Sequence, residues 1–324
     1  MSTVSLIIRS MDRPALSRAL ASVASQDAPG IDAEVLVVAA CGRAHKPVAP
    51  KTGPFGTRLV VASDGGRLTR PQAGNAGLDA ASGEYIAFLD DDDELMPHQF
   101  RTLLSEFDAD PAAQFVHARS QAVDPQGNPL YLYGGPWHDW EQLTTGFFQL
   151  GAVMFRRGLL DKGVRFDESL DILEDLEFFV QCARHAKLRY RPDPVSRYYV
   201  MDGDSGTGEG GNRDDARVQR ALGYIRDKWR DLAAELDDLP PARIHRGREQ
   251  VLRGEFAAAI ETLAPVLETQ PGEVNALNLS GLAHINVGNF AEAEVLLRRA
   301  LAVVPGHPGI EKNLALLARR RAGT

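Results

Sequence analysis

The sequence predicts an α/β domain followed by an all-α domain of helical repeats. Two observations predict the α/β domain: apolar runs alternate with amphipathic stretches from residue 4 onward, and the run Tyr85 to Leu89 ends at four consecutive carboxylates, Asp90 to Asp93. A third predicts the repeats, because small and apolar residues recur 34 positions apart after residue 240. With 324 residues, 44% of them hydrophobic and 25% charged, the chain is long enough for about two domains.

The first 90 residues fit β-α-β units of a mostly parallel, Rossmann-like sheet. We expect strands over residues 4–8, 34–38, 57–62 and 85–89, and helices over 13–26 and 71–81. Ser82-Gly83 ends the second of these helices. Because ligands bind at the carboxyl ends of such strands, the acidic tetrad Asp90–Asp93 lies where a site is expected.

The next stretch completes the α/β domain. We expect helices over 97–107 and 176–185 and strands over 115–123, 151–156 and 188–199. An aromatic segment predicts either a stacking platform for a sugar or a satellite core, and it contains Tyr131, Tyr133, Trp137, Trp140, Phe147 and Phe148. The glycine-rich segment 202–211 predicts a lid or a linker.

The C-terminal third contains an internal repeat. A helix is expected over 214–236, ended by Pro240-Pro241. The residues that recur 34 positions later are Gly247, Gly254, Phe256, Ala259, Leu263 and Pro271. This period resembles the tetratricopeptide repeat (TPR), a pair of antiparallel helices, and we expect the two units to pack against the preceding helix. The expected boundaries are 1–212 for the α/β domain, 213–239 for a connecting helix, and 240–324 for the repeats, with units 240–273 and 274–307 and a cap at 308–324.

Bulk properties narrow the functional classes. A net charge of −8 argues against a nucleic-acid partner. The cysteines, Cys41 and Cys182, are too few for a disulfide framework, and no apolar run is long enough for a transmembrane segment. We therefore expect a cytoplasmic protein, with the basic residues 319–321 as the one feature that favours the inner face of the membrane.

The tetrad needs a counterion if it folds at the end of an apolar strand, because adjacent like charges repel. A hard divalent cation, Mn²⁺ or Mg²⁺, takes oxygen ligands of this kind. The alternative is a solvated acidic loop in which an Asp caps the helix after Met96-Pro97. Glu174-Asp175 has a similar alternative as a helix-start cap.

Motifs in fixed order resemble the family 2 glycosyltransferases of the GT-A fold. They are Val4-Ser-Leu-Ile-Ile, Asn75-Ala-Gly-Leu, Ser82-Gly-Glu-Tyr-Ile-Ala-Phe-Leu-Asp-Asp-Asp-Asp, Phe166-Asp-Glu-Ser-Leu and Glu174-Asp175. The resemblance covers about residues 3 to 201 and implies a nucleotide-sugar-dependent enzyme.

The resemblance implies a donor site. Asp90 and Asp92 match the Asp-x-Asp that holds the ribose and, through Mn²⁺ or Mg²⁺, the diphosphate, and Asp91 and Asp93 are neighbours that would substitute for them. Further implied donor contacts are Ser10 and Asp12 of the first loop, Arg70 and Asn75. For Asn75 a structural cap is the alternative.

The resemblance also implies a base. Inverting members take the acceptor proton with a carboxylate of the Glu-Asp pair, which points to Asp175, with Glu174 as the second choice or as its orienting neighbour. Charges of the tetrad and burial are expected to raise the pKa of Asp175 toward the working pH, as a general base requires.

Three departures from the family pattern lie on the donor side. Ala39-Ala40-Cys41-Gly42 stands where an Asp usually bonds uracil, and Arg9-Ser-Met-Asp12 replaces Pro-Thr-Tyr-Asn. Tyr198-Tyr-Val-Met201 lacks the His that commonly follows the last strand. Since the metal and base motifs remain, these losses predict an unusual donor more than an inactive protein.

The resulting hypothesis is an inverting, divalent-metal-dependent glycosyltransferase of the hexosyltransferase type, as used in polysaccharide biosynthesis. The favoured donor is a UDP-sugar, and the acceptor is a hydroxyl of a glycan, lipid-linked glycan or protein. The repeats would bind a protein partner or pair subunits. The alternative is a degenerate nucleotide-binding scaffold whose repeats mediate protein contacts. Nucleotidyl transfer is disfavoured. Enzymes of that class place a glycine-rich, basic loop after the first strand, and residues 9–14 of this chain contain no glycine.

Overall fold

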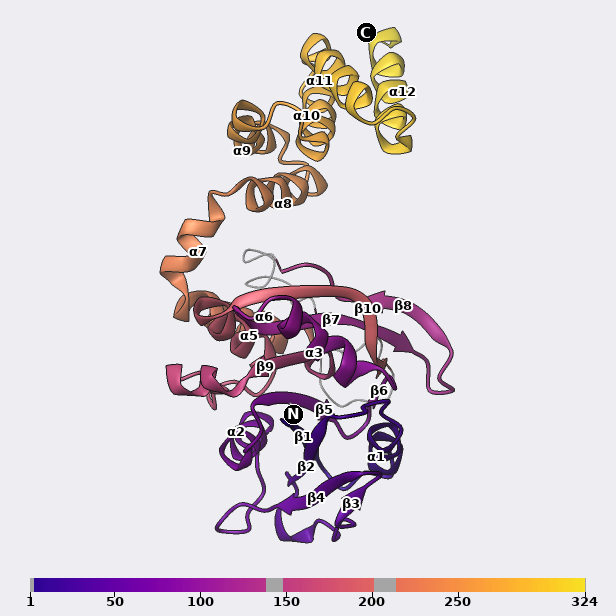
Figure 1. Cartoon of the computed structure of the whole chain (residues 1–324). Helices are drawn as coiled ribbons and strands as arrows, with labels where there is room; N and C mark the ends of the chain where they lie inside the picture. The colour runs from indigo at the N-terminus through magenta and orange to yellow at the C-terminus, as the bar shows by residue number, and fades with distance from the viewer. Residues whose placement is uncertain (1–2, 138–147, 201–213, 324) are drawn as a thin grey trace. The chain divides into compact units, whose positions relative to one another are not determined.

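The computed structural model describes residues 3–137, 148–200 and 214–323 and divides the chain into two compact units (Figure 1). The first unit is Met1–Lys228 and the second is Trp229–Thr324. The expected glycine-rich segment 202–211 and the aromatic residues Trp140 and Phe147 lie outside the described residues. None of the helices in the described ranges is both long and apolar enough to cross a membrane.

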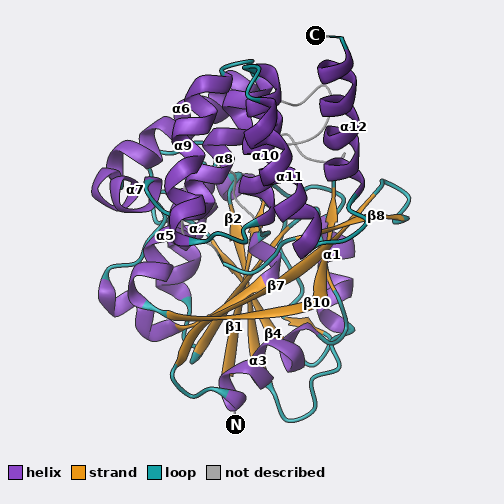
Figure 2. Ribbon diagram, turned by 90° about the horizontal axis from the view of Figure 1, so that it is seen from above, coloured by secondary structure: helices purple, strands orange, loops and turns teal. Residues whose placement is uncertain are grey.

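Four parallel strands form the part of the sheet predicted from the sequence. They are β1 (Thr3–Ser10), β2 (Asp32–Ala39), β4 (Phe55–Val60) and β5 (Tyr85–Asp90), in the order β4-β2-β1-β5. Their β-branched and aromatic residues are almost continuously buried, as strands covered on both faces require. The strands twist relative to one another, as Figure 2 shows.

The complete sheet is mixed, which corrects the expected mostly parallel one. Beyond β5 the order continues β9-β7-β10-β6, and β9 runs antiparallel to both of its neighbours. The added strands are β3 (Lys51–Thr52), β6 (Glu94–Leu95), β7 (Ala113–Val123), β8 (Pro129–Tyr133), β9 (Val153–Arg156) and β10 (Lys187–Tyr199). The strands β3 and β6 have two residues each, too short to leave an alternation in the sequence.

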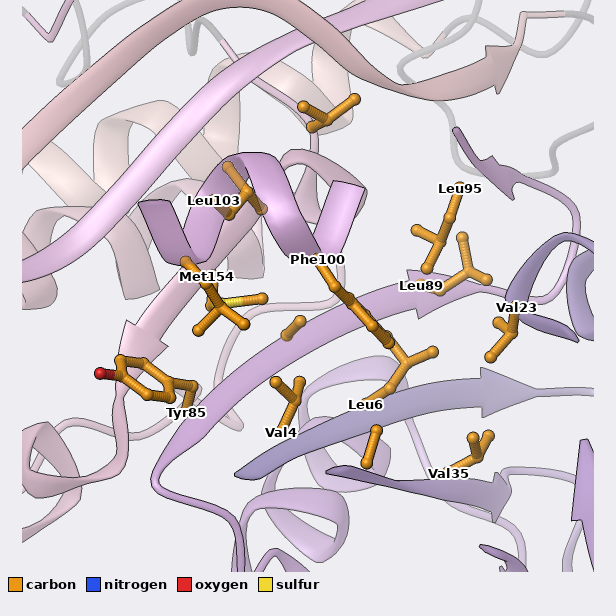
Figure 3. Packing of buried hydrophobic residues seen from close by; sticks show 14 of the residues in the cluster. Val4, Leu6, Val23, Val35, Tyr85, Leu89, Leu95, Phe100, Leu103 and Met154 are labelled. Carbon is orange, nitrogen blue, oxygen red and sulfur yellow. The ribbon is translucent and has the colours of Figure 1, made fainter. Parts of the chain in front are cut away.

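Helices cover both faces of this sheet. Alternation along β1 sends Leu6 into a cluster with α1 (Leu16–Ala24) and α3 (Gln99–Ala109). Figure 3 shows the ring of Phe100 from α3 pointing toward Leu6 and Leu89. The next residue, Ile7, lies in the opposite cluster with α2 (Arg70–Ala80) and α5 (Glu174–His185). Burial of each such side chain contributes about 1.5–3 kcal/mol, so both clusters stabilise the central strands. Among the described residues, short 3₁₀ turns lie at Gly42–Ala44, Leu150–Ala152 and Arg157–Lys162.

Part of the aromatic segment belongs to the core. Phe148 is buried, and its ring lies 4.4 Å from that of His117 and 4.6 Å from that of Phe179. Trp137 is partly buried against the same cluster. Of the two alternatives for this segment, the satellite core fits these residues, whereas Tyr131 on β8 is exposed.

The expected helix over 214–236 is two helices that belong to different units. They are α6 (Asp215–Lys228) and α7 (Arg230–Asp237), separated at Trp229, whose ψ of 31° is not helical. Lys228 ends α6 with its Nζ 2.5 Å from Asp167 and 2.9 Å from the buried Glu177 of α5. These ion pairs hold α6 on the α/β unit, so the prediction that one whole helix supports the repeats is corrected to α7 alone.

The second unit repeats a helix pair with a fixed offset. After α7 its helices are α8 (Pro240–Leu252), α9 (Phe256–Thr269), α10 (Val274–Asn286), α11 (Phe290–Val303) and α12 (Pro308–Ala322). The helix α10 begins 274 − 240 = 34 residues after α8, and α11 begins 290 − 256 = 34 residues after α9. A Cβ built on Gly247 would lie 2.7 Å from Leu263, and one on Gly281 would lie 2.7 Å from Leu297. Both pairs therefore pack backbone against leucine at the same place.

Adding one methyl group at this contact is expected to destabilise the second unit. In Gly281→Ala the side chain of Leu297 must shift, and overpacking costs about 1–3 kcal/mol while the better helix propensity of Ala returns up to about 1 kcal/mol. Hydrogen exchange of the α10 and α11 amides in increasing urea would measure the loss. Gly272→Ala is the matched control in the same unit, since nothing lies within 4 Å of a Cβ there. Equal stability of the two variants would contradict the close-contact explanation.

Candidate active site

The candidate site lies at the carboxyl ends of the inner strands β1 and β5, where the start of α5 also lies. Because β1 and β5 are parallel in a fixed register, Arg9 lies directly opposite Asp90. The helix α5 begins at Glu174, which contacts Arg9 from the other side. The acidic tetrad and the Glu-Asp pair, far apart in the sequence, therefore lie in one charged cluster.

Arg9 is the centre of this cluster. Its Nε and Nη2 donate to the two carboxylate oxygens of Asp90 at 2.9 and 3.0 Å, and its Nη1 donates to Glu174 at 2.7 Å. Burial lowers the pKa of Arg9, but the charges of Asp90 and Glu174 outweigh burial and raise it above the ordinary value. In the sequence, Arg9 stood out only as a departure from a motif. A cation at the end of a buried strand, opposite an acidic strand end, was the signal for its role.

Two members of the tetrad point into the protein. Asp91 is buried and accepts the backbone N–H of Met11 at 2.7 Å, and burial raises its pKa. Asp93 is also buried and accepts the N–H of Tyr199 at 3.0 Å, and burial with the charges of Asp92 and Asp90 raises its pKa well above normal. Through this bond Asp93, which the sequence analysis placed near a metal, joins β10 to the tetrad loop.

The other two members are partly accessible: the side chain of Asp90 is 35% exposed and that of Asp92 18%. Asp92 is paired with Arg13, which also lies 3.7 Å from Asp91. Burial, followed by the charge of Asp90, raises the pKa of Asp92, while Arg13 opposes this shift. Across the described parts of the chain, no three His, Cys, Asp or Glu side chains are grouped as a ready metal site.

The Glu-Asp pair is held by an uncommon backbone. Leu173, the residue before α5, has a φ of 59°, in the left-handed region that leucine rarely adopts. Glu174 is buried on Arg9, whereas Asp175 is partly exposed and its Oδ1 accepts the N–H of Leu176 at 2.8 Å. Burial, then the charge of Glu174, raises the pKa of Asp175 from 3.8 to about 6, against the opposing effect of Arg9. A carboxylate with this pKa suits general-base chemistry near neutral pH.

The first loop carries Ser10 and Asp12 to the same edge. The buried Ser10 Oγ accepts the N–H of Asp12 at 3.0 Å and lies 2.8 Å from Nε2 of His45. Asp12 has a φ of 60°, the second left-handed non-glycine residue beside the site. His45 was not predicted from the sequence. It follows the loop after β2, where the family's expected Asp is replaced by Ala39-Ala40-Cys41-Gly42.

Arg70 and Asn75 both lie on α2. The helix begins with a capping box in which Thr69 and Gln72 bond each other's backbone N–H. Arg70 is half-buried in the first turn. The amide of Asn75 donates to the Phe166 carbonyl and to Glu168, each at 3.0 Å, and accepts the Phe166 N–H at 2.9 Å. Asn75 thus joins α2 to the 166–168 loop, as expected for the structural alternative.

Comparisons with known proteins match this part of the chain. Residues 5–163 fit the family model described as Glycosyl transferase family 2, a stretch that contains the tetrad but ends before Glu174. The succinoglycan biosynthesis protein ExoO of Rhizobium meliloti is 31% identical over 202 residues, 57% of this chain and 57% of that protein. The uncharacterized glycosyltransferase YwdF of Bacillus subtilis is 25% identical over 210 residues, 61% of this chain and 75% of that protein. The chondroitin synthase of Pasteurella multocida is 31% identical over 152 residues, 46% of this chain and 15% of its own length. The match thus spans little more than half of ExoO.

Solved structures share the fold. The crystal structure of S. aureus TarS 1-349 in complex with UDP-GlcNAc superposes with a TM-score of 0.54 at 18% identity, covering 100% of this chain and 93% of that one. A further TarS crystal structure gives a TM-score of 0.53 at 17% identity, covering 91% of this chain and 55% of that one. At these identities the likeness is one of fold: a mixed-sheet domain of the GT-A kind and a helical C-terminal region.

Proposed function

We propose, from the match of residues 5–163 to the Glycosyl transferase family 2 model, that the chain transfers a sugar from a nucleotide-sugar donor to an acceptor hydroxyl with inversion. The observation that carries the proposal is the Arg9 cluster, which brings the donor-side carboxylate Asp90 and the Glu174–Asp175 pair to one sheet edge. An inverting transfer needs both a stabilised leaving group and a base on the opposite side of the sugar.

We assign the diphosphate end of the donor to Asp90 and Asp92, with a divalent cation, Mn²⁺ or Mg²⁺. Their donor chemistry fits such an ion, since both are partly exposed carboxylates. Burial, and then the charge of Asp90, raises the pKa of Asp92. The nearby cation Arg13 therefore does not fully offset the cost of the Asp92 charge, and this supports a further cation at the site. When bound, the cation would stabilise the negative charge that develops on the leaving diphosphate.

We assign the general base to Asp175. Its pKa of about 6 leaves the carboxylate charged at neutral pH and still basic enough to take a hydroxyl proton. Glu174, bonded to Arg9 and buried, orients its neighbour instead of reaching solvent. The proposed base therefore stands on a helix start whose position Arg9 fixes relative to Asp90.

We propose a UDP-sugar as donor, with Ser10, Asp12 and Arg70 lining the nucleotide side. The complex of TarS with UDP-GlcNAc supports this choice through the shared fold. The acceptor is a glycan, a lipid-linked glycan or a protein. ExoO is a succinoglycan biosynthesis protein, and this favours a polysaccharide acceptor. The reduced Cys41 and Cys182 support a cytoplasmic location.

For the second unit we propose tetratricopeptide-like repeats that bind the acceptor, a protein partner or another subunit. The 34-residue offset of the helix pairs and the matched Gly247–Leu263 and Gly281–Leu297 contacts support this assignment. A helix pair of this kind carries no chemistry, so the reaction is assigned entirely to the first unit.

Donor binding tests the proposal directly. Isothermal titration of the chain against UDP-, GDP-, dTDP- and CMP-sugars, with Mn²⁺ and then with EDTA, is expected to give metal-dependent binding of one nucleotide class. Asp92→Ala is expected to abolish that metal-dependent binding, because the cation loses a carboxylate ligand. Binding of no nucleotide sugar, with or without Mn²⁺, would contradict the transferase and favour the scaffold alternative. Undiminished binding in Asp92→Ala would remove Asp92 from the metal site.

A further inference from the structure

The arginines that contact the tetrad differ in how firmly they are held. The side chain of Arg9 is 9% exposed and makes three hydrogen bonds to two carboxylates, so it is fixed. Arg18 lies 3.6 Å above the ring of Tyr199 and donates to the Asp92 carbonyl at 2.6 Å, so it holds backbone. Arg13 contacts carboxylates and is 31% exposed. Arg18 is exposed to the same degree, 30%, but the Tyr199 ring and the Asp92 carbonyl hold it, so of these three arginines Arg13 is the one placed to change partner.

Arg13 holds the oxygen that a donor-site cation would need. Its Nη1 bonds Oδ2 of Asp92 and lies 3.7 Å from Asp91, so one guanidinium faces two carboxylates. A cation that binds Asp92 competes with Arg13 for the same carboxylate. A guanidinium displaced in this way is available to a phosphate group, because its planar fork matches phosphate oxygens.

The local chain permits such a change. Arg13 belongs to the first loop, between β1 and α1, and not to either element. Its carbonyl accepts the N–H of Leu16 at 3.1 Å, which fixes the backbone, while the partly exposed side chain extends to Asp92. A long side chain on a fixed backbone can change partner by rotation about its own bonds, without moving the sheet edge.

We propose that Arg13 exchanges partners during donor binding: it neutralises Asp92 before the donor arrives and binds the diphosphate of the nucleoside diphosphate once a divalent cation takes Asp92. This inference rests on the proposed function. It assigns to Arg13 a ligand, the diphosphate, and a second role as the resident counterion of the tetrad.

The exchange makes opposite predictions for the two ligands in Arg13→Gln. Mn²⁺ alone should bind several-fold tighter, at least about threefold, because its competitor is gone and the tetrad is less neutralised. UDP at saturating Mn²⁺ should bind about tenfold weaker or more, because a charge-assisted hydrogen bond is lost. Both affinities can be measured by isothermal titration on the full chain, without any turnover. Arg13→Lys, which keeps the charge, should leave the Mn²⁺ affinity nearer to wild type.

Arg101→Gln is the matched control, because Arg101 pairs with Asp27 on an exposed surface away from the tetrad. Both affinities should equal those of wild type. If Arg13→Gln binds Mn²⁺ and UDP like wild type, or loses both equally, Arg13 is a fixed structural partner and the exchange is wrong. If wild type binds Mn²⁺ but no UDP, the proposed function fails together with the diphosphate role. Thermal unfolding of each variant shows whether it is folded.

Discussion

Replacing Asp175 with Asn is expected to lower kcat by about 10³-fold or more and to leave nucleotide-sugar binding close to that of wild type. Asn has the shape of Asp but cannot take the acceptor proton. The Asp175 side chain bonds the adjacent backbone N–H of Leu176, a contact that the Asn oxygen can retain. The helix start should therefore be preserved. Transfer rates and titration of the donor, measured on the same preparation, would separate loss of chemistry from loss of binding.

The pH dependence gives the same test in the wild-type protein. The proposed base, Asp175, would act in its charged form, and its pKa is raised from 3.8 to about 6. We therefore expect kcat to be half-maximal near pH 6 and to fall about tenfold per pH unit below that. Glu174→Gln is the comparison variant. If Glu174→Gln loses transfer and Asp175→Asn keeps it, the two roles are exchanged, and full activity in both variants would contradict the carboxylate base.

Replacing Arg9 with Met is expected to destabilise the first unit by about 3–5 kcal/mol, because removing one partner of a buried ion pair leaves its partner charge uncompensated. Glu174 is buried and would lose the cation that faces it at 2.7 Å, and Asp90 would lose both of its hydrogen bonds. Hydrogen exchange of the β1 and β5 amides in increasing urea would report the loss where it arises. The stability of Arg9→Lys should lie between those of wild type and Arg9→Met, because one ammonium group cannot bond both carboxylates as the planar guanidinium does.

Two comparisons make the Arg9 prediction specific. Arg101→Gln removes an exposed pair and should cost at most about 1 kcal/mol. The Arg9→Met deficit should shrink at low pH, because protonation of the freed carboxylates removes the buried charge. A deficit below about 1 kcal/mol at neutral pH would show that the cluster does not depend on Arg9.

The sequence was sufficient to predict the four parallel strands and the position of a charged cluster beside them. Near-continuous apolar runs predicted β1, β2, β4 and β5, and the carboxylates after β5 lie in the Arg9 cluster at the carboxyl ends of these strands. The 34-residue recurrence predicted the helix pairs of the second unit at their observed spacing. Each of these signals is local, because burial imposes a period on neighbouring residues.

The partners of the charged side chains were not predictable in this way. Arg9 bonds Asp90 and Glu174, which are 81 and 165 residues away, and no local pattern selects those carboxylates from the others. Asn75 and Asp93 also have partners that are distant in the sequence. The amide of Asn75 is hydrogen-bonded to Phe166 and Glu168, and Asp93 accepts a hydrogen bond from the N–H of Tyr199. Motif position alone could not distinguish a side chain that faces a ligand from one that joins two loops.

The separation of α6 from α7 at Trp229 also depends on contacts between residues distant in the sequence. The amphipathic pattern continues through residues 214–236, and so it predicted one helix. The ion pairs of Lys228 with Asp167 and Glu177 attach α6 to the first unit, and the chain turns after them. A tertiary contact therefore overrides a continuous local preference.

The left-handed backbone at Leu173 has a consequence for how the reaction proceeds. A leucine in that region is held against its own preference by the surrounding structure. For a carboxylate that acts as base, this means that its direction is set by the main chain before any substrate arrives. The reorganisation that would otherwise accompany each turnover is then completed once, when the chain folds.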